Sequence, residues 1–235
     1  LPRSTGKASL DYRLKRFTRA AHLPPLERHH GWKEIFAPDV RAALTGRRHG
    51  WDPFSLVQDR FQETEGHELL TRLQDVDLGT YLVDDLLVKT DRSSMAWSLE
   101  SRVPFLDTVV TNFAFSLPAS LRVRGFEKKR LLRRAVEPLL PHAVVHGRKR
   151  GFSIPAARWL RGDLEPFARE TLSPATLRRQ GLLDPVAVTR VLDQHVSGRA
   201  DLSRQLWGLL ALTLWFERHV EGVRRDASLS GMVTG

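Results

Sequence analysis

The chain has 235 residues, of which 41% are hydrophobic and 27% are charged, an ordinary balance for a globular protein with its own core. It contains no cysteine, which excludes disulfides, thiolate metal sites and a cysteine nucleophile within this sequence. The longest apolar run, residues 207–216, is too short to cross a membrane. The first residues lack the apolar core of a secretory signal, so we expect a cytoplasmic protein.

The net charge is +10, from 37 basic and 27 acidic residues. Such an excess favours anionic partners, which include nucleotides, pyrophosphate, nucleic acid and acidic membranes. Arginine-rich helix faces also arise from codon usage alone. The charge therefore narrows the class of partner without choosing one.

Hydrophobic periodicity and capping residues predict helices through most of the chain. We expect them at residues 10–21, 39–46, 53–64, 65 to about 95, 108–117, 127–136, 185–196 and 202–220, with short helices after Pro155 and Asp163. Residues 102–107 should be extended and 121–125 a short strand or loop. We predict a mainly α fold, with one domain over residues 1–221 and a disordered tail at 222–235.

The long helix that leads into residues 75–107 carries the most informative pattern. Its charged residues fall in two lines at helical spacing, Asp77–Asp84–Asp91 and Asp85–Lys89–Arg92. An acid four residues before a base is the stabilising order for a helical ion pair, so a solvated, salt-bridged face is one interpretation. The surrounding leucine, valine and tyrosine favour a second one, in which several charges are half-buried and mark a site.

Two further basic clusters are candidates for a site: Lys128–Arg130 and Arg148–Arg150. The second lies between Gly147 and Gly151, in a predicted loop that could present cations to a polyanion. A solvated basic surface is the alternative for both clusters. The sequence holds no Walker loop, dinucleotide fingerprint, nucleophile elbow or metal-ligand spacing. Cations that converge from separate segments on pyrophosphate would suit phosphoryl or adenylyl transfer.

Three motifs in this order resemble the synthetase domain of glutamine-dependent asparagine synthetases: YLVDDLLVKTDRSSMAWSLESRVPFLD, EKKRLLRRA and RKRGFSIPAARWL. The resemblance extends over most of residues 10–220. It implies the helical C-terminal portion of an adenine-nucleotide alpha-hydrolase-like (PP-loop ATP pyrophosphatase) α/β synthetase domain. It also implies a carbon–nitrogen ligase that uses ATP with Mg to adenylate the aspartate β-carboxylate. Glutamine-derived ammonia then gives asparagine, AMP and pyrophosphate.

The same resemblance implies roles for six residues. Lys149 would be the catalytic lysine that holds the α-phosphate and pyrophosphate, and Lys89 would act near the pyrophosphate. Arg92 and Arg148 would bind the nucleotide. The supporting residues would be Asp85, which with Arg92 steadies Lys89, and Arg102, which helps to fix the turn before residue 107. The implied partners are an N-terminal glutaminase domain, in the same or another chain, and a second copy in a homodimer.

The sequence departs from the family pattern at three places. It has no N-terminal cysteine nucleophile, no SGGxDS pyrophosphate loop and no SGEGxDE segment. We therefore expect a fragment or a split subunit that is inactive alone, whose ATP and Mg are held mainly by other segments, with no metal ligands in this chain.

Two other functions stay open. One is a relative that uses the same adenylation to close a β-lactam or a peptide macrocycle. The other is a helical nucleic-acid-binding module, for which only the net charge and the basic helix 127–136 argue. Because no binding motif supports that module, we expect neither a nucleic-acid nor a membrane partner.

Overall fold

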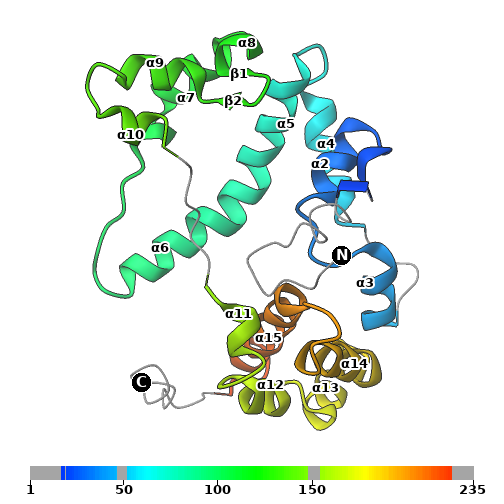
Figure 1. The fold of residues 1–235 in the computed structure, drawn as a ribbon. Helices are drawn as coiled ribbons and strands as arrows, with labels where there is room; N and C mark the ends of the chain where they lie inside the picture. The colour runs from blue at the N-terminus through cyan, green and yellow to red at the C-terminus, as the bar shows by residue number, and fades with distance from the viewer. Residues whose placement is uncertain (1–16, 19, 47–51, 148–153, 224–235) are drawn as a thin grey trace. The chain divides into compact units, whose positions relative to one another are not determined.

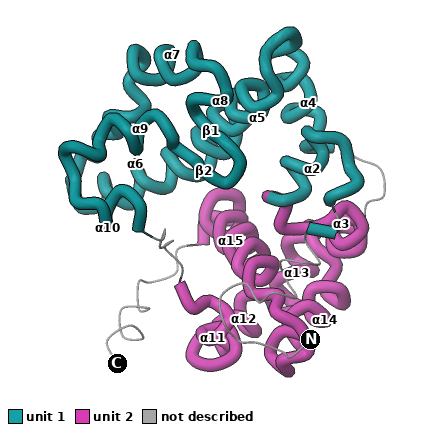
Figure 2. The backbone as a smooth tube through the Cα atoms, turned by 45° about the horizontal axis from the view of Figure 1, so that its top comes forward, with its two compact units in different colours: residues 1–32, 52–151 teal, residues 33–51, 152–235 magenta. Residues whose placement is uncertain are grey.

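The computed structural model describes residues 17–18, 20–46, 52–147 and 154–223, which fall into two compact units (Figure 2). Unit 1 comprises residues 1–32 and 52–151, and unit 2 comprises residues 33–51 and 152–235. Helices dominate both units, which confirms the prediction of a mainly α chain. Among the described helices, none is both long and apolar enough to span a bilayer. The domain over residues 1–221 and its tail stay a prediction.

A continuous helical segment forms the longest part of unit 1 (Figure 1). It joins α5 (Leu69–Asp77), η1 (Leu78–Leu87) and α6 (Val88–Met95), because the backbone stays helical at both junctions. The other elements of unit 1 are α2 (Pro25–Gly31), α4 (Phe54–Glu63), η2 (Pro104–Leu106), α7 (Thr108–Ser116), α8 (Ala119–Arg122), β1 (Val123–Arg124), β2 (Glu127–Lys128), α9 (Arg130–Val136) and α10 (His142–Val145). The 3-10 turn η2 lies within the segment predicted to be extended.

The middle of this long helix is π-helical, which the α-helical periodicity did not predict. In a π-helix each hydrogen bond spans five residues, so side chains seven apart no longer lie in one line. The aspartates accordingly differ in environment: Asp77 is half-buried and lies 2.8 Å from His29 Nε2, whereas Asp84 and Asp91 are exposed. The predicted line Asp77–Asp84–Asp91 is therefore not one structural feature.

Arg60 of α4 holds the long helix where α5 meets the π-helical part. Its Nε donates to the backbone oxygen of Asp75 at 3.0 Å, and its Nη2 donates to that carboxylate at 3.2 Å. Gly79 lies directly against the guanidinium: a Cβ on Gly79 would stand 2.0 Å from Arg60 Cζ. The glycine is required here by close approach of a side chain.

We expect Gly79→Ala to lower the free energy of unfolding by about 1–2 kcal/mol, because the new methyl group displaces Arg60 from its charge-assisted bonds. In an Arg60→Ala background the same substitution should stabilise by about 0.5–1 kcal/mol, the usual gain of alanine over glycine in a helix. Urea denaturation of the four proteins in this double-mutant cycle measures both values. An equal effect of Gly79→Ala in both backgrounds would contradict the contact.

A short hairpin replaces the first turn of one predicted helix. β1 and β2 pair antiparallel, with Val123 opposite Lys128 and a turn at Gly125, whose φ is +58°. The prediction of a strand or loop at residues 121–125 is confirmed in part: Val123 and Arg124 form the strand. The prediction that the helix begins at residue 127 is wrong: α9 begins at Arg130, because residues 127 and 128 are strand-paired and residue 129 has a φ of +56°.

Arg122 attaches this hairpin to α5. Its guanidinium donates to Gln74 Oε1 and to Thr71 Oγ1, each at 2.5 Å, and lies 3.7 Å from the Glu68 carboxylate. The Arg122 side chain is 10% exposed. Glu68 also accepts a hydrogen bond from the backbone nitrogen of Ala119, at the start of α8.

Unit 2 contains α3 (Pro38–Thr45), α11 (Ala156–Trp159), α12 (Glu165–Thr171), α13 (Pro174–Gln180), α14 (Pro185–Val196) and α15 (Ser203–His219). Asp184 caps α14 by accepting from the backbone nitrogen of Ala187 at 2.7 Å, which confirms the predicted helix start. The main hydrophobic core lies in this unit: Leu44, Leu160, Ala168, Leu172, Leu177, Val188, Leu192, Leu206, Leu209 and Leu210. α15 packs on α11, α12 and α14, although Trp207 and Trp215 are exposed.

Unit 1 buries far fewer apolar side chains. Of its described residues, only Ala20, Leu26, Val76 and Val145 belong to the buried hydrophobic set. A helical segment of this size ordinarily needs a packed apolar face for stability. Unit 1 thus exposes much of the apolar surface that such a face would bury.

Candidate functional site

The central candidate residue of unit 1 is Lys89, on the second residue of α6. Its Nζ lies 3.6 Å from Asp85 Oδ1, one turn earlier, and the two side chains are 62% and 52% exposed. Asp85 therefore stands beside Lys89, as the i,i+4 spacing suggested. An exposed pair of this kind contributes only about 0.3–0.5 kcal/mol to stability, so both charges stay available to a ligand.

Arg92 and Arg102 follow on α6 and on the loop after it. The Arg92 side chain is exposed and makes no hydrogen bond or ion pair with another residue in the described ranges. Arg102 lies 2.7 Å from the Glu100 carboxylate and is likewise exposed. Close by in sequence, Asp107 caps α7 by accepting from the backbone nitrogens of Val109 and Val110, at 2.9 and 3.3 Å, and α7 begins at residue 108 as predicted.

Arg148 and Lys149, the other candidates, lie outside the described residues. Their predicted convergence with Lys89 on one ligand therefore stays a prediction. In the ranges that the structure describes, no group of three or more acidic or histidine side chains could hold a metal ion.

Large apolar side chains surround these cations in the sequence, and most of them face solvent. Trp97 is 81% exposed, Phe105 67% and Val109 75%; Met95, Leu99, Val103, Val110 and Phe113 are also exposed. We call residues 95–113 the apolar segment. A concentration of exposed apolar surface usually marks an interaction site with another polypeptide or domain.

One titrating group in unit 2 was not singled out from the sequence. Burial lowers the pKa of Lys33 to about 8. This side chain therefore loses its proton at a pH much closer to neutral than an exposed lysine does. The only sequence signal is the position of this lysine among large side chains in HHGWKEIF. Burial of that kind is set by tertiary packing, so the pattern of charges could not reveal it.

These features describe a helical protein with exposed cations beside an exposed apolar surface. The described part is a mainly helical module in which exposed cations on α6 precede an apolar segment with the surface of an interface. Exposed lysine and arginine side chains fit the phosphates of a nucleotide.

The profile of the asparagine synthase family matches residues 2–217, and the chain belongs to this family. A provisionally named asparagine synthetase (glutamine-hydrolyzing) of Mycobacterium tuberculosis is 38% identical over 227 residues, 94% of this chain and 34% of that protein. Asparagine synthetase (glutamine-hydrolyzing) 1 of Bacillus subtilis is 31% identical over 202 residues, 84% of this chain and 31% of that protein. The protein named amidase chry2 of Gibberella zeae is 29% identical over 109 residues, 44% of this chain and 16% of that protein.

The chain thus spans about a third of the length of the asparagine synthetases it matches. No solved structure matches the chain.

Proposed function

We propose that this chain forms the helical C-terminal part of the synthetase domain of a glutamine-dependent asparagine synthetase, within a PP-loop ATP pyrophosphatase fold. The observation that carries the proposal is the family match over residues 2–217, which includes the three motifs in order. By the full-length enzyme we mean the longer polypeptide in which this chain would be the C-terminal part. A cytoplasmic location and a homodimer belong to the same proposal.

The proposed reaction has two transfers. An oxygen of the aspartate β-carboxylate attacks the α-phosphorus of ATP, the bond to the β-phosphate breaks, and pyrophosphate leaves. Ammonia from glutamine then attacks the activated carbonyl carbon, and AMP leaves as asparagine forms. The chain's task is to bind and neutralise phosphate charge that shifts during both steps, which is the main catalytic contribution in such transfers.

Lys89 and Lys149 would supply that charge. Lys89 lies on a helix with its ammonium group exposed. Asp85, at 3.6 Å, restricts the positions of this ammonium group but leaves it accessible to solvent. Arg92, one turn further, and Arg148 would bind the nucleotide phosphates, and Arg102 would support the turn that leads to α7. In this arrangement residues 85, 89 and 92 form one wall of the pyrophosphate site, and a part of the full-length enzyme outside this chain supplies the other wall.

The apolar segment supports the same proposal. Side chains as exposed as Trp97 and Phe105 need a covering surface, and unit 1 itself has few buried apolar residues to stabilise it. We propose that the remainder of the synthetase domain covers this segment, and that a glutaminase domain delivers the ammonia.

Two other functions have less support. A relative that activates a different carboxylate would share every residue discussed above, so only the choice of acceptor separates it from an asparagine synthetase. A nucleic-acid-binding module would use the basic helix as its binding surface. That helix, α9, begins later than predicted and is only seven residues long, so it offers a smaller surface than the sequence suggested.

In the full-length enzyme, Lys89→Ala should lower kcat/KM for ATP by about tenfold or more, because a charge-assisted contact to phosphate is lost. Lys89→Arg should restore most of the activity, since its charge reaches the same position. The exposed Arg218, on α15, provides the control: Arg218→Ala should stay within about twofold of the parent. Initial rates of pyrophosphate release at varied ATP measure all three.

If Lys89 served only the ion pair, Asp85→Ala and Lys89→Ala would change stability equally by a few tenths of a kcal/mol. ATP kinetics would then be unaltered. That result would remove Lys89 from the proposed site.

A further inference from the structure

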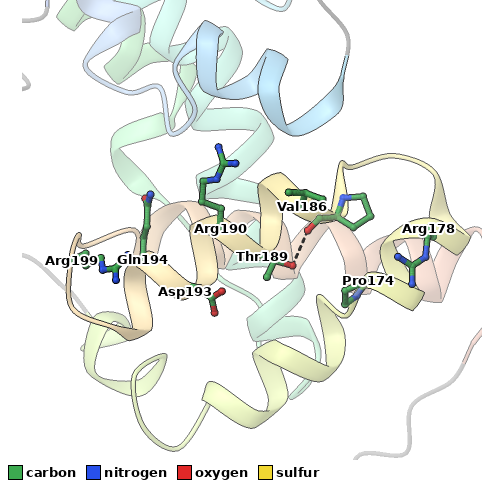
Figure 3. A pocket seen from close by; sticks show the side chains of 9 residues that line it. Pro174, Arg178, Val186, Thr189, Arg190, Asp193, Gln194 and Arg199 are labelled. Atoms are coloured by element: carbon green, nitrogen blue, oxygen red, sulfur yellow. Dashed lines mark hydrogen bonds between the residues drawn. The ribbon is translucent and has the colours of Figure 1, made fainter.

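A groove in unit 2 is lined by residues to which no role has been assigned above. It runs along one face of α14, with α13 at one end and the turn after α14 at the other, and encloses about 640 Å³ (Figure 3). Its lining residues are Pro174, Arg178, Pro185, Val186, Thr189, Arg190, Asp193, Gln194 and Arg199. Those on α14 recur at three and four residues, so they form one helical face.

Three of the lining residues are arginines with uncommitted guanidinium groups. Arg178, Arg190 and Arg199 are exposed, and none makes a hydrogen bond or ion pair through its side chain with any residue that the structure describes. Other arginines of unit 2 are engaged: Arg179 pairs with Glu217 and Glu221, and Arg161 donates to the backbone oxygen of His195. The groove is thus lined by three guanidinium groups that make no hydrogen bond or ion pair within the described fold.

The one carboxylate in the groove is engaged by an arginine that does not line the groove. Asp193 Oδ1 accepts from Arg169 Nη1 at 3.0 Å, and the same arginine pairs with Glu165 at 2.9 Å. These hydrogen bonds, first to Glu165 and then to Asp193, raise the pKa of Arg169, so its charge is fixed. Thr189 is also engaged, since its hydroxyl donates to the backbone oxygen of Pro185 at 2.8 Å (Figure 3).

The spacing of the arginines indicates an extended ligand. Residues 185 and 194, which bound the groove on α14, are nine residues apart, or about 13 Å along a helix axis. Arg178 and Arg199 stand beyond these positions at opposite ends, as Figure 3 shows. A single phosphate or carboxylate cannot contact all three arginines, whereas a polypeptide of four or more residues in extended form covers about the same length.

The remaining lining residues favour a polypeptide over a nucleic acid. Pro174, Pro185 and Val186 give one end an apolar surface, and Val186 is 68% exposed. No aromatic side chain lines the groove, so bases would have no surface on which to stack. We propose that this groove binds an acidic polypeptide segment, in which carboxylates meet the three arginines and an apolar side chain meets the proline–valine end.

Fluorescence anisotropy of the 235-residue chain with a fluorescein-labelled peptide tests the proposal. The peptide would alternate glutamate and alanine around one central leucine, in about 0.1 M salt to limit unspecific attraction. We expect saturable binding that Arg190→Gln/Arg199→Gln weakens by about tenfold or more, since two charged contacts are lost. The control Arg158→Gln/Arg218→Gln removes the same charge from exposed positions of unit 2 outside the groove, and should change binding less than about twofold.

Three outcomes would overturn the proposal. Equal weakening by both double variants would indicate attraction by net charge, and equal binding of a peptide with glutamine in place of glutamate would exclude carboxylate recognition. Tighter binding of an oligothymidylate that depends on Arg190 and Arg199 would assign the groove to nucleic acid instead. Because the substituted arginines are exposed and unpaired within the described chain, circular dichroism should show unchanged folding.

Discussion

Lys149→Met in the full-length enzyme should lower the rate of asparagine formation by about a thousandfold, while glutamine hydrolysis stays near that of the parent. A lysine that stabilises phosphate charge during transfer acts like other preorganised electrostatic groups, whose removal costs about 100- to 1000-fold in rate. Methionine keeps most of the length of the side chain and removes the ammonium group with its charge and its three N–H donors. Asparagine and glutamate measured separately by chromatography report the two half-reactions.

The control for this variant is Arg218→Met, which removes an exposed cation on α15 that has no proposed role. It should leave both half-reactions within about twofold of the parent. Asparagine formation at the parental rate by Lys149→Met would contradict the role of this residue. A parallel loss of glutamine hydrolysis would instead indicate damage to the whole enzyme.

His195→Ala should lower the free energy of unfolding of the chain by about 3 kcal/mol, the combined effect of a cavity and two unsatisfied backbone groups. The side chain is fully buried in unit 2. Its Nδ1 accepts from the backbone nitrogen of Leu202 at 3.1 Å, and its Nε2 lies 3.2 Å from the backbone oxygen of Ala157. This pattern requires a neutral ring with the proton on Nε2. Urea denaturation at pH 7.5 measures the loss.

The same histidine predicts a dependence on pH. Burial first, and the charge of Arg161 second, lower the pKa of His195 below its ordinary value of 6.5. Above pH 6.5 the ring is neutral in both states, and its contribution to stability is complete. As the pH falls through 6.5, the unfolded chain binds a proton that the folded chain does not, so the contribution is progressively lost.

The difference in stability between the parent and His195→Ala should therefore shrink between pH 7.5 and pH 5.5. His22→Ala serves as the control, because His22 is exposed and should give a difference near zero at both pH values. A parent–variant difference that grows on acidification would show that the folded state binds the proton more tightly, contrary to the burial of the ring.

Much of the fold could be predicted from local sequence signals. Asp107 and Asp184 each occupy a helix N-cap as expected, since a carboxylate that accepts backbone N–H bonds needs no distant partner. The π-helical part of the long helix and the hairpin at residues 123–128 could not be predicted in the same way. The first accompanies a tertiary contact, in which Arg60 lies against Gly79, and the second depends on strand pairing.

In the candidate site too, features set by local helical spacing could be predicted, and features set by tertiary packing could not. Helical spacing correctly placed Asp85 beside Lys89, because i,i+4 neighbours are determined by the helix alone. The expectation that several charges of this helix are half-buried is wrong for Asp84, Asp85, Lys89 and Arg92, all of which are exposed. Burial depends on what packs against the helix, and a sequence pattern does not contain that information. The uncommitted arginines of the unit 2 groove were missed for the same reason.

We propose that these residues serve the adenylation of aspartate. The most direct measurement is release of AMP and pyrophosphate from ATP by the full-length enzyme with a panel of carboxylates, each supplied with glutamine. We expect release only with aspartate, with AMP, pyrophosphate and asparagine formed in equal amounts. Release of ADP and phosphate, or release that requires another carboxylate and not aspartate, would contradict it.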